Sequence, residues 1–225
     1  MSDLPIFPSW RSTSAPSTKT PGSSSRTKAP KASASLSAED AKAAADFEAA
    51  IAAEKVKYAD RPTIGLASAY IRYALWLADH GQYAEARAQT DLAEPVSVFH
   101  VIRNEAFRRK AQAYALEAEK AAEDSRPPLW KGCADAAGRA ISEGLDATQV
   151  PAEVAMLKGG LIVISRGIGN AYTLRGMCTA KLGDEAGALR DFGKAVEHLS
   201  LSPEEAETVS RLNTWMQQLQ APKTP

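Results

Sequence analysis

The stretch from Asn170 to Glu197 carries residues at spacings that close two helices against each other as a hairpin. Two small residues, Gly176 and Ala188, fall near the middle of the predicted helices, where the backbones can approach closely only if no larger side chain intervenes. The first helix is predicted to end at Gly183, because glycine accepts the left-handed conformation that ends many helices. Asp184 follows as a cap for the second helix. The turn is therefore specified locally.

This segment resembles the tetratricopeptide repeat (TPR), a family of 34-residue helical hairpins. The positions that carry the resemblance are Tyr172, Arg175, Gly176, Leu182, Gly183, Asp184, Ala188, Phe192 and Ala195. Residues 68–95 resemble the same repeat less closely, with Thr90 where the family has an aromatic residue. Tyr70, Ala74, Gly81, Ala86, Thr90 and Ala93 each lie 102 residues before their counterparts, which is three family periods. The intermediate 34-residue steps fail, so we do not expect two ordinary repeats between the two segments.

The resemblance implies an all-α fold of TPR-like antiparallel hairpins, stacked in a right-handed superhelix with a C-terminal capping helix. We expect this helical domain to span residues 38–220. In the TPR family the first helices of successive hairpins line a groove that binds extended or helical peptides. Carried over position by position, the resemblance implies a partner-binding groove at Ile71, Leu75, Asp79, Asn170, Thr173, Met177 and Lys181. The family's carboxylate-clamp pattern is not recognisable, so chaperone C-termini are not the expected ligand.

Capping signals and apolar periodicity predict the other helices. The first opens with a capping box at Ser37 to Asp40, and Ala44, Phe47, Ile51 and Tyr58 trace one apolar stripe along it. Further helices are expected at residues 62–80, 98–123, 129–144, 151–182 and 203–219. The helix at 151–182 should bend or break at the glycines of 159–160 and 167–169. Ser202 should cap the last helix, which we expect to cover the final hairpin.

Residues 1–37 are rich in Ser, Thr, Pro, Ala and Lys and hold too little apolar material to offset chain entropy, so we predict a disordered tail. Residues 221–225 are also expected to be disordered. Within the tail, Leu4 to Trp10 form an apolar cluster, which is either a solvated segment or a linear motif that docks on a partner or on the folded body. We expect no secretory signal and a cytoplasmic protein, while the basic, Ser-rich tail leaves organelle targeting through residues 1–37 as an alternative.

Charge argues against nucleic acid as the main partner. The chain holds 27 basic and 27 acidic residues, but residues 1–37 take five of the basic and one of the acidic, so the folded body is net acidic. Nucleic-acid binding requires clustered Lys and Arg. Arg103, Arg108, Arg109 and Lys110 do form a basic segment, for which we predict a solvated face, with an acidic-peptide contact as the alternative. Arg175 is instead expected to pack or hydrogen-bond within its hairpin.

The sequence shows no catalytic, cofactor-binding or metal-binding constellation. His80, His100 and His198 are scattered, and Cys133 and Cys178 are predicted to be reduced residues buried in helices rather than a disulfide. The run from Leu161 to Tyr172 lacks the third glycine of a dinucleotide-binding loop and is too short in apolar length to span a membrane.

These observations favour a non-enzymatic protein–protein interaction module, an adaptor, scaffold or assembly factor whose partner is another protein or a peptide. A homo-oligomer is left open. The alternatives are a regulatory factor that acts through its basic tail on nucleic acid or an acidic partner, and an enzyme of unrecognised type.

Overall fold

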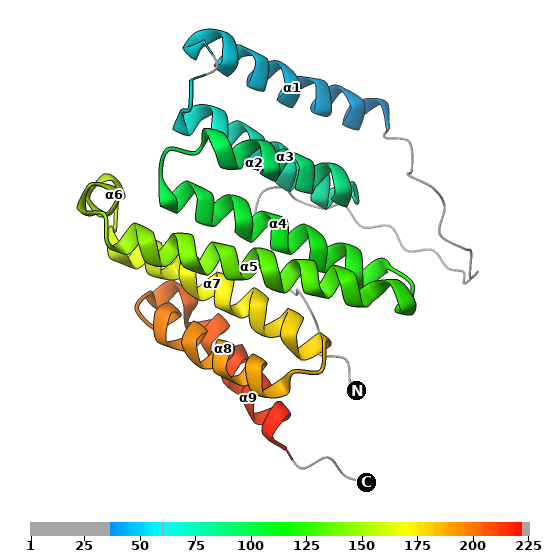
Figure 1. Cartoon of the computed structure of the whole chain (residues 1–225), viewed down its shortest axis with the longest axis vertical. Coiled ribbons are helices and arrows are strands. Elements are labelled where there is room, and N and C mark those ends of the chain that lie inside the picture. Colours follow the sequence, from blue (N-terminus) through cyan, green and yellow to red (C-terminus); the bar gives the residue numbers. More distant parts are fainter. Residues whose placement is uncertain (1–36, 60, 222–225) are drawn as a thin grey trace. The chain divides into compact units, whose positions relative to one another are not determined.

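The computed structural model describes residues 37–59 and 61–221, and all regular structure in these residues is helical (Figure 1). The helices are α1 (Ala38–Tyr58), α2 (Ile64–Asp79), α3 (Tyr83–Val96), α4 (His100–Lys120), α5 (Arg126–Thr148), α6 (Pro151–Met156), α7 (Leu161–Lys181), α8 (Glu185–Leu199) and α9 (Ala206–Gln220). Short 3₁₀ turns lie at Glu123–Ser125 and Pro203–Glu205. The all-α prediction is thus confirmed for the described residues.

The chain divides into two units, Met1–Leu36 and Ser37–Pro225, and the second contains all of the described helices. Ser37 belongs to this unit, and its hydroxyl accepts a hydrogen bond from the Asp40 amide and caps α1. The predictions made for residues 1–36 and 222–225, including disorder and the motif at Leu4 to Trp10, lie outside the described residues.

Helices that follow one another in the chain pack as three hairpins, α2 with α3, α4 with α5, and α7 with α8. Neighbouring hairpins join because α3 packs on α4 and α5 packs on α7, while α9 covers α8. The first helices of the hairpins also touch, α2 against α4 and α4 against α7. α1 packs on α2 through Phe47, whose ring stacks on Tyr73.

The α7–α8 hairpin has the local features that its sequence predicts. Gly183 adopts a φ of +87°, and the Asp184 carboxylate accepts a hydrogen bond of 2.7 Å from the Gly187 amide. A Cβ atom added to Gly176 would lie 2.7 Å from the ring of Phe192, which is completely buried. Close contact between the two helices therefore depends on the absence of a side chain at position 176.

Arg175 of α7 hydrogen-bonds within the same hairpin, as predicted. Its guanidinium donates two hydrogen bonds to the Asp191 carboxylate, with Nε–Oδ2 and Nη2–Oδ1 distances of 2.9 and 2.7 Å. A two-pronged contact of this kind fixes geometry as well as charge. Arg175 thus links α7 to α8.

The structure between residues 95 and 170 explains why no ordinary repeats lie between the two TPR-like segments. A single hairpin, α4 with α5, occupies this region, and its helices of 21 and 23 residues are longer than those of α2–α3. The short helix α6 and a turn through Gly159 and Gly160, both at positive φ, separate it from α7. The predicted break at 159–160 is confirmed.

Two predictions about helix details are wrong. α7 continues without interruption through residues 167–169, and a Cβ at Gly169 would lie 2.6 Å from the Leu199 side chain, so this glycine serves close packing of α8. The apolar stripe of α1 packs on the core through Ala44, Phe47 and Ile51, whereas its last member, Tyr58, is 38% exposed. Ser202 makes no side-chain cap, because the chain enters α9 through a 3₁₀ turn.

A carboxylate from α6 caps the amino terminus of α4. Glu153 is buried, and its two oxygens accept hydrogen bonds from the backbone amides of His100 and Val101 at 3.0 and 2.9 Å. These amides have no partner inside their own helix, and a negative charge at this end is favourable. Glu153 therefore fixes where α4 begins.

Candidate partner-binding face

The seven residues implied for the partner-binding groove differ in accessibility. Ile71, Thr173 and Met177 are buried, with 8%, 5% and 8% of their surface exposed, and so offer little to a partner. Leu75, Asn170 and Lys181 are half-buried, and Asp79 is exposed. Since α4 lies between α2 and α7, residues of α4 complete any surface that joins these two groups.

Helix α4 carries a cluster of charged and polar side chains, formed by Glu105, Arg108, Arg109 and Gln112, which we call the α4 charge cluster. Arg108 Nε donates to Glu105 Oε2 at 3.0 Å, and Arg109 Nε donates to Glu105 Oε1 at 2.7 Å. Arg109 Nη1 also donates to Gln112 Oε1 at 3.0 Å. One carboxylate thus organises both arginines.

The charges of the cluster shift one another's pKa. Burial acts to raise the pKa of Glu105, but the charges of Arg108 and Arg109 and their hydrogen bonds outweigh it and lower this pKa to about 2. Burial lowers the pKa of Arg109, whereas the negative charges of Glu105 and Asp79 act to raise it. Asp79 is on α2, so the cluster interacts across the α2–α4 boundary.

Lys181 connects the third hairpin to the same side of α4. Its Nζ lies 3.8 Å from the Glu119 carboxylate. Glu119 follows Glu105 by fourteen residues and Gln112 by seven, and residues so spaced share one side of a helix. The surface across α2, α4 and α7 that carries Leu75, Asp79, the α4 charge cluster, Asn170 and Lys181 is here called the first-helix face.

The basic segment of α4 does not form the solvated face that its sequence predicted. Arg108 is only 8% exposed. Arg103 points to another neighbour, donating to the Glu143 carboxylate of α5 at 2.8 Å, and Lys110 pairs with Asp91 of α3. The spacing of Glu105 three and four residues before two arginines was the signal for an internal cluster.

We expect Glu105→Gln to lower the free energy of unfolding at pH 7 by about 2 kcal/mol, because both arginines lose their counter-charge while the partly exposed site retains some solvent screening. The depressed pKa means that the carboxylate stabilises the fold above pH 4.5 and that this contribution is lost as the pH falls towards about 2. The variant should therefore lose less stability than the parent over this range. Urea unfolding at pH 7 and at pH 3 measures both effects.

The matched control is Asp135→Asn, which breaks the exposed Lys131–Asp135 pair of α5. Its stability should barely change, because exposed ion pairs contribute little. Equal losses for the two variants would contradict the assigned role of Glu105.

One pair of side chains has the composition of a nucleophile and a base but lies in the packing between α7 and α8. Ser165 Oγ is 2.8 Å from His198 Nδ1, and the His198 ring stacks on Tyr172. Burial lowers the pKa of His198. Ser165 is only 6% exposed, so a substrate does not reach its hydroxyl. Sequence reasoning missed the pair because its members are 33 residues apart without a motif.

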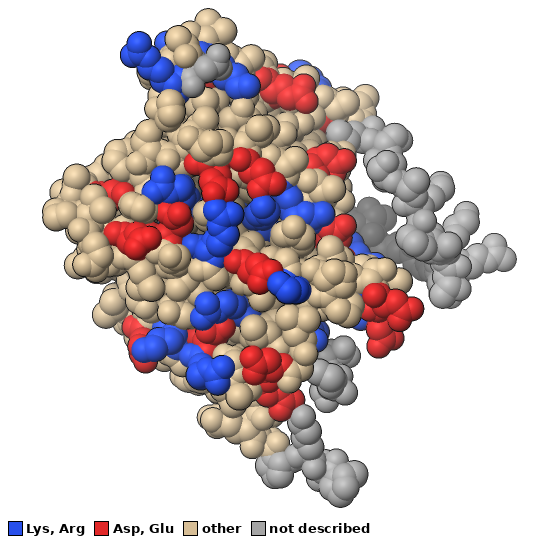
Figure 2. All heavy atoms as spheres, in the orientation of Figure 1, with Lys and Arg blue, Asp and Glu red and all other residues tan. Residues whose placement is uncertain are grey.

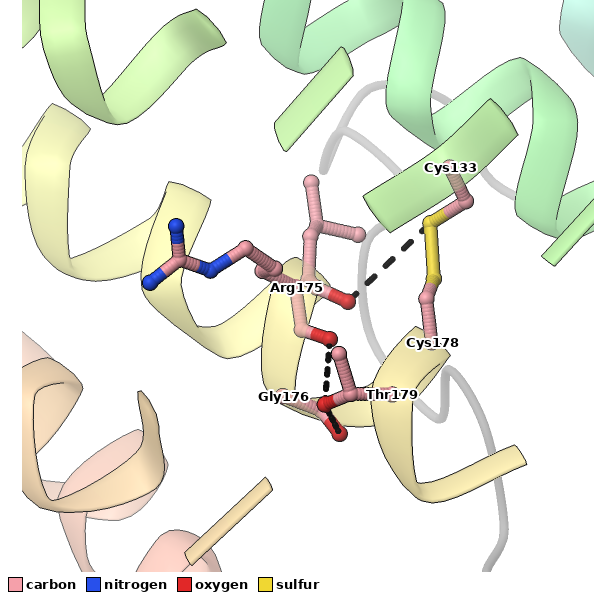
Figure 3. The surroundings of a disulfide bond; sticks show 6 residues. Cys133, Arg175, Gly176, Cys178 and Thr179 are labelled. Carbon is pink, nitrogen blue, oxygen red and sulfur yellow. Dashed lines mark hydrogen bonds between the residues drawn. A yellow bond between two sulfur atoms is a disulfide. The ribbon is translucent and has the colours of Figure 1, made fainter. Parts of the chain in front are cut away.

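Cys133 and Cys178 form a disulfide between α5 and α7 (Figure 3). The prediction of two reduced cysteines is wrong, although both are completely buried as expected. They are 45 residues apart, and their Cα atoms are 6.1 Å apart, a separation that a disulfide spans without backbone movement. Helix packing brings them together, which a spacing argument does not reveal.

Charged side chains on the visible face in Figure 2 are interleaved, with acidic residues between the basic ones. Within the described ranges, no group of three or more His, Cys, Asp or Glu side chains is placed to hold a metal ion. None of the helices in the described part is both long and apolar enough to cross a membrane. Neither a family model, nor a curated protein, nor a solved structure matches the chain.

Proposed function

We propose that this protein is a non-enzymatic interaction module, an adaptor, scaffold or assembly factor, that binds a peptide or helix of another protein on the first-helix face. The observation that carries the proposal is the contact of α2 with α4 and of α4 with α7, which places the first helices of three hairpins side by side. TPR-like stacking in a right-handed superhelix is part of the same proposal, and it would turn this face into the inner surface.

The chemistry of the face suits a polypeptide of mixed character. Leu75 offers apolar surface, Asn170 offers an amide, and Asp79 and Lys181 offer opposite charges at separate places. Amide and carboxylate groups of a bound chain would pair with these side chains. The bound chain would therefore need no net charge of either sign.

The α4 charge cluster supports the proposal through rigidity. Its arginines are held by Glu105, so they do not need to be ordered when a partner arrives. A preorganised surface loses less conformational entropy on binding, and this raises affinity for a given set of contacts. Arg108 and Gln112 are themselves buried, so the half-buried Glu105 and Arg109 would serve as the fixed centre against which a partner is positioned.

Affinity capture from the native extract tests the proposal. The bait variants are Leu75→Glu and Asn170→Glu, which add charge at half-buried positions of α2 and α7, whereas Met177 is avoided because it is buried. We expect each variant to recover at least about tenfold less of the wild-type partner, which corresponds to about 1.4 kcal/mol.

Lys131→Glu on α5 is the control, since this side chain is 71% exposed and lies on a second helix. It should recover the partner normally, and circular dichroism should show all three variants to be folded. Undiminished recovery by both folded face variants would refute the proposal. Recovery of a second copy of this chain as the partner would identify a homo-oligomer.

A further inference from the structure

The Cys133–Cys178 disulfide joins the second hairpin to the third. Cys133 belongs to α5 and Cys178 to α7, and Figure 3 shows the bond bridging the two helices while the Arg175 side chain points away from it. The segment that it closes contains the rest of α5, all of α6, the turn with Gly159 and Gly160, and most of α7. The connection between α5 and α7 departs most from a simple hairpin repeat. The cross-link therefore restrains the least regular part of the described chain.

Complete burial determines how the bond can react. A disulfide is reduced when a thiolate attacks one of its sulfur atoms, so the attacking thiol must reach that sulfur. Both cysteines are 0% exposed and lie between α5 and α7, which pack against each other. Reduction therefore requires α5 and α7 to separate, and a redox switch that works in the folded state is excluded by access.

The same restriction applies to formation of the bond. An oxidising protein forms a mixed disulfide with one cysteine before the second cysteine displaces it, and a packed α5–α7 interface has no room for that intermediate. Oxidation must therefore precede the final packing of the second hairpin against the third.

We propose that Cys133 and Cys178 are the modification site of a dithiol–disulfide oxidant that acts on the chain during folding, and that the protein matures in a compartment that contains such an oxidant. The two thiols release two protons and two electrons as the S–S bond forms. The disulfide of the oxidant accepts both and leaves as a dithiol. The packed helices then shield the cross-link from reductants in the folded protein.

This inference does not depend on the proposed partner-binding function, and it bears on location. A cytoplasmic protein with reduced cysteines was expected, whereas stable disulfides belong mainly to oxidising compartments. Maturation with an oxidant therefore argues for a compartment other than a reducing cytosol.

The first test counts thiols in the full-length protein from its native cells. Cells are quenched in acid, the protein is alkylated in denaturant with or without prior reduction, and its intact mass is measured. We expect no alkyl groups without reduction and two after it. Two alkyl groups without reduction in most molecules would overturn the proposal.

The second test measures protection of the bond. Oxidised full-length protein is incubated with millimolar glutathione in native buffer and in urea, and bond loss is followed by alkylation and mass. We expect reduction to be at least about tenfold slower in native buffer, because the open form is rarely populated. Equal rates in the two conditions would show that the packed helices do not shield the bond and would also overturn the proposal.

Discussion

Replacing both disulfide cysteines, Cys133→Ala with Cys178→Ala, is expected to lower the free energy of unfolding by about 4 kcal/mol. The chain-entropy model gives this value for a closed loop set by a separation of 45 residues, because the cross-link removes conformations from the unfolded state. Such a loss is a large share of the stability of an ordinary domain. Urea unfolding of the oxidised parent and of the double variant measures it.

A matched control separates the cross-link from side-chain volume. The parent protein, reduced in denaturant and refolded with reductant present, keeps both sulfur atoms and lacks only the bond. Its free energy of unfolding should approach that of the double variant. A difference below about 1 kcal/mol between oxidised and reduced parent would contradict the role assigned to the bond.

Gly176→Val should lower the free energy of unfolding by about 3 kcal/mol. A Cβ atom at this position would meet the Phe192 ring at 2.7 and 2.8 Å and the Asp191 Cβ at 3.2 Å, so the α7–α8 hairpin must open to accept it. Phe192 cannot yield easily, since it is completely buried and its ring lies beside Trp215 of α9. Thermal or urea unfolding detects the loss.

Gly193→Val in α8 is the matched substitution for this experiment. A Cβ added at Gly193 would enter open space beside α8, so the same change should alter stability by less than about 0.5 kcal/mol. If both variants lost the same stability, helix propensity rather than close packing would explain the effect at Gly176.

The sequence predicted the fold best where structure is encoded locally. Gly183 and Asp184 form the turn between α7 and α8 through backbone conformation and a cap four residues or fewer away, and both were predicted from the residues alone. The close approach at Gly176 followed from the same hairpin pattern. The helix content and the break at 159–160 were also predicted from residues close together in the chain.

The features that the sequence did not reveal depend on contacts between distant helices. The Cys133–Cys178 bond arises from packing of α5 on α7, and apolar spacing does not set which faces of the two helices meet. Gly169 was predicted to interrupt its helix. Its packing partner, Leu199 of α8, is 30 residues away along the chain, so local sequence did not reveal the close contact.

The candidate site shows the same division. The resemblance supplied residues on α2 and α7, but it did not include α4, because the longer middle hairpin lies outside the repeat pattern. Burial of Ile71, Thr173 and Met177 depends on neighbouring helices, which a position-by-position transfer does not take into account.

Site-specific photocross-linking in the native extract tests the central claim, partner binding on the first-helix face, most directly. A photoreactive residue is placed at Asp79 of α2, at Asn170 of α7, or at the exposed Lys131 of α5 as the control position. The account predicts that positions 79 and 170 form covalent adducts with the same polypeptide and that position 131 does not. Adducts that form at position 131 but at neither 79 nor 170 would contradict it.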